Sequence, residues 1–303
     1  MSTLPEASRH ARVGYLGPAG TFSEEALLAS AAADAIEPVA LASIYETVMA
    51  LREGDVRWAI VPIENSLEGS INVTLDLLAG DAGDVEIVGE ALLRVRHSLI
   101  GTEAVPLAEI ETVITHPQVP GQCTLFLRSE LPQARILAAG STAEAVRSVL
   151  SGGDRSQAAL GTTLAAEIYG GTVIREGVED REDNETRFVW LAPRDRQRSE
   201  SGRPPLRSRA GGEWKTSLVF WGAGAERPGW LVHCLDEFAR RDINLTKIES
   251  RPRRERLGSY MFFADVAGRI GDASVDEAIA GLKTMCEEVR VLGSYPAAES
   301  LAR

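Results

Sequence analysis

The sequence predicts an α/β protein with a large unit, a linker and a small C-terminal unit. In residues 11–193, short apolar runs alternate with amphipathic helical stretches, which is the pattern of parallel α/β folding. Residues 194–213 are rich in Arg, Ser, Pro and Gly and almost empty of large apolar side chains, so they predict a linker. Residues 214–296 show strands and helices in the order βαββαβ, which predicts a ferredoxin-like sandwich.

The strands of the large unit are expected at its short apolar runs, which are VGYLG, WAIVP, TVITH, ARILAA and AALG. Three helix starts carry a capping box, in which a hydroxyl residue precedes Glu by three positions: Thr21, Ser43 and Ser141. At Thr21 and Ser141 the helix follows a strand and a glycine, which presents free backbone N–H groups to a carboxylate or phosphate. The glycine spacing fits neither a dinucleotide fingerprint nor a P-loop, so an ordinary βα turn stays as the alternative.

The small unit opens with the strand KTSLVFWG and ends with the strand VRVLGSYP. Between them lie the helices RPGWLVHCLDEFARRD and ASVDEAIAGLKTMCEE and the strands INLTKIESRP and GSYMFFADVAG. Pro228 stands near the start of the first helix, where its missing N–H is harmless. Alone, such a module indicates ligand sensing or dimerisation rather than chemistry.

Composition narrows the class of protein. The formal net charge of -12 argues against nucleic-acid binding, which needs clustered Lys and Arg. No apolar run approaches the roughly 20 residues of a membrane span, and the N-terminus lacks a signal-peptide stretch, so we expect a cytoplasmic protein. The three cysteines are widely spaced and predict reduced thiols, and the four histidines are equally scattered. We therefore expect no metal site.

Seven segments, in order along the chain, resemble the prephenate dehydratase family, and they extend over nearly the whole sequence. They are GPAGTFSEEA, VPIENSLEGSIN, HPQVPGQC, STAEAV, AALGTTLAAEIYG, NETRF and LTKIESRP. The small unit resembles an ACT domain, the amino-acid-sensing module of the monofunctional bacterial enzymes. No chorismate mutase segment precedes VGYLG, so a free-standing enzyme is expected.

The resemblance implies a two-lobed, type II periplasmic-binding-protein-like catalytic domain at residues 11–193, with the active site between the lobes. Lobe 1 is expected at about 11–92 and 176–193, and lobe 2 at about 93–175. A linker at 194–213 and an ACT domain at 214–296 complete the expected organisation.

The implied reaction is the decarboxylating dehydration of prephenate to phenylpyruvate, carbon dioxide and water, which makes the protein a carbon–oxygen lyase of phenylalanine biosynthesis. Prephenate carries two carboxylates and a ring hydroxyl. Formation of the aromatic ring drives the reaction, so the enzyme must hold a dianion and help a poor leaving group depart. No cofactor is expected, because this chemistry needs no electron sink, metal or nucleotide.

The resemblance assigns the catalytic roles to five residues, which are Thr186, Glu64, Asn65, Gln122 and Thr115. Thr186 is expected to offer its hydroxyl to the departing ring hydroxyl, as a general acid or as a hydrogen-bond donor. Glu64 helps a dianionic substrate only if it is protonated or paired. Thr115 stands where the family commonly has serine. Without the family, Thr186 is a β-branched strand residue and Arg187 a surface charge.

The residues expected to bind substrate supply positive charge, hydrogen bonds or helix N-termini. They are Arg187, Phe188, Ser66, Thr21, Phe22, Ser23, His116, Gln118, Ser141, Thr142 and Ala143. The two helix starts at Thr21 and Ser141 would suit the two carboxylates, which is a hypothesis. For His116, a structural role is the alternative.

The ACT domain is expected to bind an amino-acid effector, L-phenylalanine by family precedent, between two segments at a dimer interface of a homodimer or homotetramer. The effector residues are Gly229, Trp230, Leu231, Val232, Asn244, Leu245, Thr246, Glu249, Ser250, Arg251 and Pro252. Trp230 replaces the family's alanine, and its indole either fills a pocket or redirects the ligand.

Two other functions compete with this interpretation. A two-lobed solute receptor or regulator effector domain is a non-catalytic alternative, against which the NETRF and PIENS motifs argue. Arogenate dehydratase is the closer rival, because its substrate differs only by an amino group in place of the keto oxygen.

Overall fold

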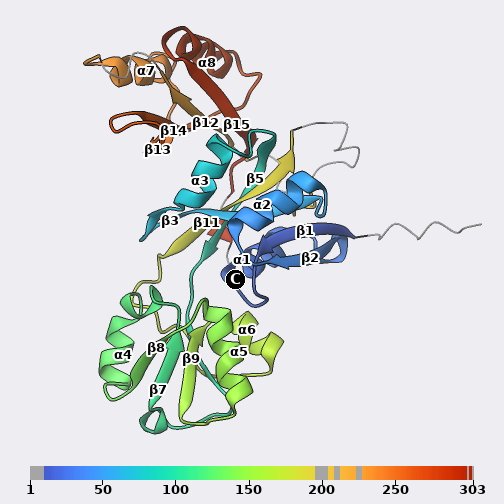
Figure 1. The fold of residues 1–303 in the computed structure, drawn as a ribbon, viewed down its shortest axis with the longest axis vertical. Coiled ribbons are helices and arrows are strands. Elements are labelled where there is room, and N and C mark those ends of the chain that lie inside the picture. The colour runs from blue at the N-terminus through green and yellow to red at the C-terminus, as the bar shows by residue number, and fades with distance from the viewer. Residues whose placement is uncertain (1–9, 195–203, 208–211, 223–226, 299, 302–303) are drawn as a thin grey trace, which may run out of the picture. The chain divides into compact units, whose positions relative to one another are not determined.

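The computed structural model describes residues 10–194, 204–207, 212–222, 227–298 and 300–301 (Figure 1). The chain forms two compact units. Unit 1 comprises residues 1–74, 91–188 and 300–303, and unit 2 comprises 75–90 and 189–299. Most of the expected linker, at 195–203 and 208–211, lies outside the described residues. The expected domain boundaries therefore stay predictions.

The first sheet of unit 1 holds the strands that lead to PIENS and NETRF. β1 (Ala11–Leu16) pairs in parallel with β2 (Ile36–Leu41) and β3 (Trp58–Asn65), and β4 (Gly69–Ser70) pairs antiparallel with the end of β3. Most of β3 is buried, as expected of an apolar run that forms a central parallel strand. The helices are α1 (Phe22–Ser30), η1 (Ala33–Ala35), α2 (Ile44–Glu53) and α3 (Asn72–Ala79).

Two long strands, β5 (Val85–Arg94) and β11 (Glu185–Pro193), each have residues in both units. After β5 the chain enters a second sheet, and it returns to β11 after that sheet is complete. The short C-terminal strand β16 (Ser300–Leu301) pairs in parallel with the end of β5. This passage out and back gives the chain its two-lobed organisation.

The second sheet of unit 1 has the strand order β10-β6-β9-β7-β8. Its strands are β6 (Ser98–Gly101), β7 (Thr112–Thr115), β8 (Arg135–Ala138), β9 (Gln157–Gly161) and β10 (Thr172–Arg175). Its helices are η2 (Leu107–Glu109), η3 (Val119–Gly121), α4 (Thr124–Glu130), α5 (Thr142–Gly152) and α6 (Thr163–Tyr169). In Figure 1, α4 covers one face of the sheet and α5 and α6 cover the other.

Side chains of successive strand residues serve the two faces of this sheet in turn. Leu99 and Leu160 join the apolar cluster that includes Leu127 of α4, while Ile100 and Ala159 join the cluster that includes Val146 of α5. The alternation follows from the two-residue period of a strand. Both faces are therefore packed, and catalytic groups are left for the strand ends.

Two of the three capping boxes form as expected. The hydroxyls of Ser43 and Ser141 accept hydrogen bonds from the backbone N–H groups of Glu46 and Glu144, at 3.1 and 3.0 Å. The expectation for Thr21 was wrong, because its hydroxyl donates to the carbonyl of Leu16 at 2.9 Å and caps nothing.

The C-terminal part of unit 2 is a ferredoxin-like sandwich, as expected. Its antiparallel sheet has the order β13-β14-β12-β15. The elements are β12 (Trp214–Trp221), α7 (Trp230–Ala239), β13 (Leu245–Pro252), β14 (Tyr260–Ala267), α8 (Ala273–Met285) and β15 (Glu288–Pro296). The predicted α/β class with a C-terminal βαββαβ domain is thus confirmed. No helix in the described ranges is long and apolar enough to cross a membrane.

Candidate active site

The PIENS and NETRF motifs lie side by side in unit 1, although more than a hundred positions separate them. Ser66 follows the end of β3, and its backbone N–H donates to the carbonyl of Glu185 at 2.9 Å. The N–H of Glu185, at the start of β11, donates in return to the Ser66 hydroxyl at 3.0 Å. These two bonds fix one strand end against the other and bring their polar side chains together.

Asn65 is the centre of this cluster. Its Nδ2 group donates to Oδ1 of Asn184 and to Oγ1 of Thr186, both at 2.9 Å. Its Oδ1 accepts the backbone N–H groups of Leu67 and Glu68, both at 2.9 Å. The Asn65 side chain is 9% exposed and held at both ends, so it fixes the position of the Thr186 hydroxyl.

Glu64 and Arg187, which precede Asn65 and follow Thr186 in their strands, form an ion pair with 3.5 Å between Oε2 and Nη1. The side chain of Arg187 is 8% exposed and that of Glu64 is 35% exposed. Such a pair balances the charge of a nearly buried guanidinium. It also means that Glu64 is paired with a positive charge, so its carboxylate is not a bare negative charge. Successive residues of β11 therefore carry a placed hydroxyl, on Thr186, and a held positive charge, on Arg187.

Gln122 joins the cluster through its carbonyl oxygen. Oε1 lies 3.1 Å from both Nδ2 of Asn184 and Nε2 of His97. The backbone of Gln122 is held as well, because its carbonyl accepts the N–H of Asp180 at 2.7 Å. Phe22, at the start of α1, packs edge-on against the His97 ring, with the ring centroids 5.4 Å apart.

His97 and Asn184 were not among the expected site residues. Asn184 stands inside NETRF, two positions before Thr186, so its motif carried a signal. His97 carried none, since it is a lone histidine outside every matching segment. Both are almost fully buried, at 1% exposure. Burial lowers the pKa of His97 from 6.5, while the hydrogen bond to Gln122 and the charge of Glu179 act in the opposite direction.

The THPQ segment is held in a different way. The Thr115 hydroxyl is buried and donates to the carbonyl of Leu160 at 2.9 Å. Its hydrogen is therefore used in a bond between β7 and β9 of the second sheet. Nδ1 of His116 accepts the N–H of Gln118, and the Gln118 side chain reaches Glu68 at 3.4 Å. Gln118 is thereby joined to the turn that holds Asn65. The catalytic role of Thr115 and the binding roles of His116 and Gln118 stay predictions.

At the starts of α1 and α5, which are expected to bind carboxylates, most of the expected residues are buried or hydrogen-bonded within the protein. At α1, Thr21 and Ser23 are buried, and the carbonyl of Gly20 accepts the hydroxyl of Thr162 at 2.7 Å. At α5, Ser141 caps its own helix, with Thr142 and Ala143 buried behind it. Phe188 is a core residue at 1% exposure. Whether α1 and α5 together hold the two carboxylates stays a prediction.

The expected effector residues lie in unit 2, on or before α7 and β13. Gly229 precedes α7 in the left-handed conformation, with φ of 85°, which favours glycine. Trp230 is 8% exposed, packs against the rings of Phe220 and Phe262, and donates its indole N–H to the carbonyl of Met285 at 3.0 Å. The indole therefore fills the domain core.

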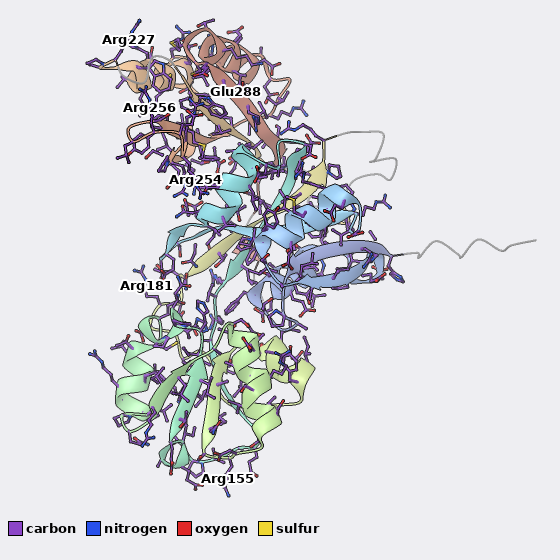
Figure 2. The ribbon with its side chains drawn as sticks, in the orientation of Figure 1. Arg155, Arg181, Arg227, Arg254, Arg256 and Glu288 are labelled. Atoms are coloured by element: carbon purple, nitrogen blue, oxygen red, sulfur yellow. The ribbon has the colours of Figure 1, made fainter. Side chains whose placement is uncertain are left out.

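Arg251, in the ESRP segment of β13, is already engaged. Its guanidinium donates from Nε and Nη2 to Asp76 of α3, at 2.9 to 3.2 Å. Arg254, labelled in Figure 2, adds a contact of 2.5 Å to the same carboxylate. Val232, Asn244, Thr246, Ser250 and Pro252 are exposed, while Leu231, Leu245 and Glu249 are half-buried.

Among the described residues, no group of three or more His, Cys, Asp or Glu side chains could hold a metal ion. The chemistry available in unit 1 is therefore a placed hydroxyl, side-chain amides, and a paired guanidinium. Such a set binds anions and donates hydrogen bonds to a leaving oxygen.

Comparison with known families gives two matches. The prephenate dehydratase family model matches residues 13–196, and the ACT domain model matches residues 224–284. A prephenate dehydratase of Mycobacteroides abscessus is 39% identical over 291 residues, which cover 94% of this chain and 90% of that protein.

Two solved structures have closely similar folds. The prephenate dehydratase of Arthrobacter aurescens in complex with L-Phe is 33% identical, with a TM-score of 0.81 over 94% of this chain and 89% of that one. A protein described as a novel type of quorum-quenching acylase is 27% identical, with a TM-score of 0.80 over 95% of this chain and 98% of that one. Because one fold is found with different activities, the residues of the site determine the function.

Proposed function

Because the chain belongs to the prephenate dehydratase family and carries an ACT domain, we propose that it converts prephenate into phenylpyruvate, carbon dioxide and water in phenylalanine biosynthesis. Members of this family are carbon–oxygen lyases. The observation that carries the proposal for this chain is the hydrogen bond from Asn65 to the Thr186 hydroxyl, and the Glu64–Arg187 ion pair between the same two strands supports it.

The reaction breaks two bonds of the substrate ring. The bond to the ring carboxylate breaks and releases carbon dioxide, and its electron pair enters the ring. The bond to the ring hydroxyl breaks at the opposite carbon, and the hydroxide takes a proton and leaves as water. No oxidant or reductant takes part. The enzyme must therefore bind two carboxylates and donate hydrogen bonds to one departing oxygen.

Thr186 is the donor to the departing oxygen. Its Oγ1 accepts from Asn65, so its own hydrogen stays free to point at another acceptor. A threonine hydroxyl is a weak acid, and its effect comes from placement. Hydrogen bonds to charge that develops in the transition state are worth about 10²- to 10³-fold in turnover for each donor.

Arg187 binds a substrate carboxylate. Glu64 keeps the guanidinium in place through the 3.5 Å ion pair and remains partly exposed, so it can move aside when the substrate arrives. Gln122, Ser66, Phe22 and the start of α1 complete the binding surface. Thr115, His116, Gln118 and the start of α5 belong to the same proposal.

Regulation belongs to the proposal as well. The Arthrobacter relative is described as a complex with L-Phe, which supports L-phenylalanine as the effector of this ACT domain. We expect binding between the start of α7 and the ESRP segment, in a homodimer or homotetramer, and a cytoplasmic location. Trp230 occupies the domain core, so the space that it takes is not available to the effector.

The test is turnover of prephenate and of arogenate by the purified protein beside Thr186→Ser, Thr186→Ala and Thr186→Val. We expect wild-type protein to form phenylpyruvate from prephenate. Thr186→Ser should keep most of the activity, while the Ala and Val variants should lose about 10²- to 10³-fold in kcat with little change in melting temperature. Thr172→Ala, a strand threonine of the second sheet, is the matched control.

Each outcome separates the candidates. Turnover of arogenate alone would replace the substrate. No turnover of either compound by folded protein, with or without L-phenylalanine, would remove the enzyme assignment. Full activity in Thr186→Val would remove Thr186 from the mechanism and leave the family assignment standing.

A further inference from the structure

The polarity of the hydrogen bonds around Asn65 is set by two backbone groups. The N–H groups of Leu67 and Glu68 only donate, and both point at one side-chain atom of Asn65, which must therefore be Oδ1. The other end of the amide is then Nδ2, which only donates. Asn65 has one permitted orientation.

This orientation propagates through Asn184. Because Nδ2 of Asn65 donates, the Asn184 atom 2.9 Å away must be Oδ1, which leaves Nδ2 of Asn184 facing Gln122. The Gln122 atom at 3.1 Å must in turn be the acceptor Oε1. Nε2 of His97 lies 3.1 Å from that same oxygen, so it has to carry a hydrogen.

We infer that His97 is a positioning residue for Gln122, which together with Asn184 holds the Gln122 carbonyl so that the side-chain NH₂ is presented to the substrate. The inference rests on the proposed function, which places Gln122 in the active site. His97 acts as a neutral imidazole protonated on Nε2. It touches no reacting atom and works through the amide that it orients.

The surroundings of His97 favour this one form. The residue is 1% exposed, and Nδ1 has no hydrogen-bond partner among the described residues. A proton on Nδ1 would be a buried donor without an acceptor, whereas a bare Nδ1 costs less. The ring packs perpendicular to that of Phe22, and the backbone N–H donates to Glu179 at 2.9 Å. Burial also lowers the pKa of His97, in agreement with a neutral ring.

Two donors on one carbonyl prevent the Gln122 amide from turning over. The bond from Asn184 alone sets which end of the amide is the acceptor, but it leaves the amide free to tilt about that one contact. The second donor, His97, removes this freedom and fixes the direction in which the NH₂ group points. The two donors therefore determine where Gln122 presents its NH₂ group, and a misplaced group of this kind costs up to about 10²-fold in rate.

The first test is a double-mutant cycle in prephenate turnover. His97→Phe keeps the ring against Phe22 and removes the N–H, and we expect kcat/KM to fall about 10- to 100-fold. In the Gln122→Ala background, the same change should have no further effect, because the group that His97 orients is gone. Equal losses in both backgrounds would overturn the inference.

Rescue by a donor gives the second readout. Glutamine carries an NH₂ group near the position of Nε2, so His97→Gln should retain most of the kcat/KM that His97→Phe loses. His233→Gln, at an exposed histidine of α7, is the matched control and should match wild type. If His97→Gln and His97→Phe lose kcat/KM equally with unchanged melting temperatures, the donor has no role and the inference fails.

The third readout does not depend on activity. Long-range ¹H–¹⁵N NMR spectra of the substrate-free protein report which ring nitrogen of His97 carries the hydrogen. We expect Nε2–H, and Nδ1–H would overturn the inference even in an active enzyme. If the spectra show Nε2–H but Gln122→Ala turns over prephenate normally, the chain of hydrogen bonds stands and the role of Gln122 in the proposed function falls.

Discussion

A neutral histidine in the core of unit 1 makes stability depend on pH in one direction. The folded protein holds the pKa of His97 below 6.5 by burial, and unfolding returns it to about 6.5. Below that value the unfolded chain binds a proton that the folded one does not, so the free energy of unfolding falls as the pH drops. Above it the contribution of His97 is constant. Urea unfolding at about pH 7.5 and about pH 5.5 measures the difference.

The control for this pH dependence is His97→Gln, whose side chain does not titrate. The remaining histidines contribute equally in both proteins, as do Glu179, which accepts the His97 N–H, and Arg96, which lies 3.7 Å from Glu179. We expect the loss of stability between the two pH values to be smaller in the variant. Identical losses would mean that His97 titrates with the same pKa in the folded and unfolded chain.

Among single residues, the sequence identified those whose contacts join the PIENS motif to the NETRF motif. Thr186, Arg187, Glu64 and Asn65 stand in two short segments that resemble the family, and the structure joins those segments. Asn184 was missed although it stands inside NETRF, and His97 was missed because its role arises from a contact with Gln122, 25 positions away. A lone buried histidine has no periodicity or spacing that would reveal such a contact.

Helices and strands were predictable from the sequence where burial of apolar side chains alone determines their position. β3 and β9 are uniform apolar runs and are buried, so their place was predictable. β2 is largely exposed and β5 alternates, and neither gave a distinct signal. The hydroxyl of Thr21 fits a capping box by spacing, yet it donates to the carbonyl of Leu16 and accepts no N–H from the first turn of α1. Spacing along the chain does not fix how a hydroxyl is oriented, because that depends on neighbours that only the folded chain brings close.

The N-cap of α2 gives a prediction outside the active site. The Ser43 hydroxyl accepts the N–H of Glu46 at 3.1 Å. The Glu46 carboxylate in turn accepts the N–H of Ala42 at 3.2 Å. Ser43→Ala leaves the first turn without its acceptor, so we expect the free energy of unfolding to fall by about 1 kcal/mol, measured by urea denaturation.

Ser43→Asp is the matched variant, because aspartate caps helices as well as serine and complements the helix dipole. Its stability should equal that of wild type. Neither variant should alter prephenate turnover. A loss of turnover in Ser43→Ala at unchanged stability would show that α2 acts on the site rather than on the fold.

At the scale of the whole molecule, α3 is a continuous element that begins in unit 1 and ends in unit 2. In unit 1, the hydroxyl of Thr74 donates to the carbonyl of Pro62 at 2.6 Å, two positions before Glu64. In unit 2, Asp76 receives the bidentate guanidinium of Arg251 from the ESRP segment. Thr74 and Asp76 are two positions apart, so a single turn of α3 contacts both the strand that carries the site and the segment expected to bind the effector.

This connection predicts that Asp76→Asn uncouples the effector from turnover. The neutral amide loses the ion pairs to Arg251 and Arg254. A shift of β13 on effector binding is then no longer transmitted to α3 through these contacts. We expect unchanged turnover without effector, and a change of about 0.5 to 2 kcal/mol in the coupling between L-phenylalanine and substrate. The measurement is the affinity for L-phenylalanine with and without a non-reacting substrate analogue, beside turnover over a range of L-phenylalanine concentrations.

Asp81→Asn is the matched control, because Asp81 is an exposed acid that follows the same helix. It should keep the wild-type coupling. Coupling that survives in Asp76→Asn, while L-phenylalanine still binds, would rule out this contact as the route. By reciprocity, bound substrate must change the affinity for L-phenylalanine by the same factor as the effector changes the affinity for substrate. Any loss of coupling in Asp76→Asn must therefore appear equally in both affinities. If the effect of L-phenylalanine on turnover changes while the coupling between the two affinities does not, Asp76→Asn alters catalysis itself rather than communication along α3.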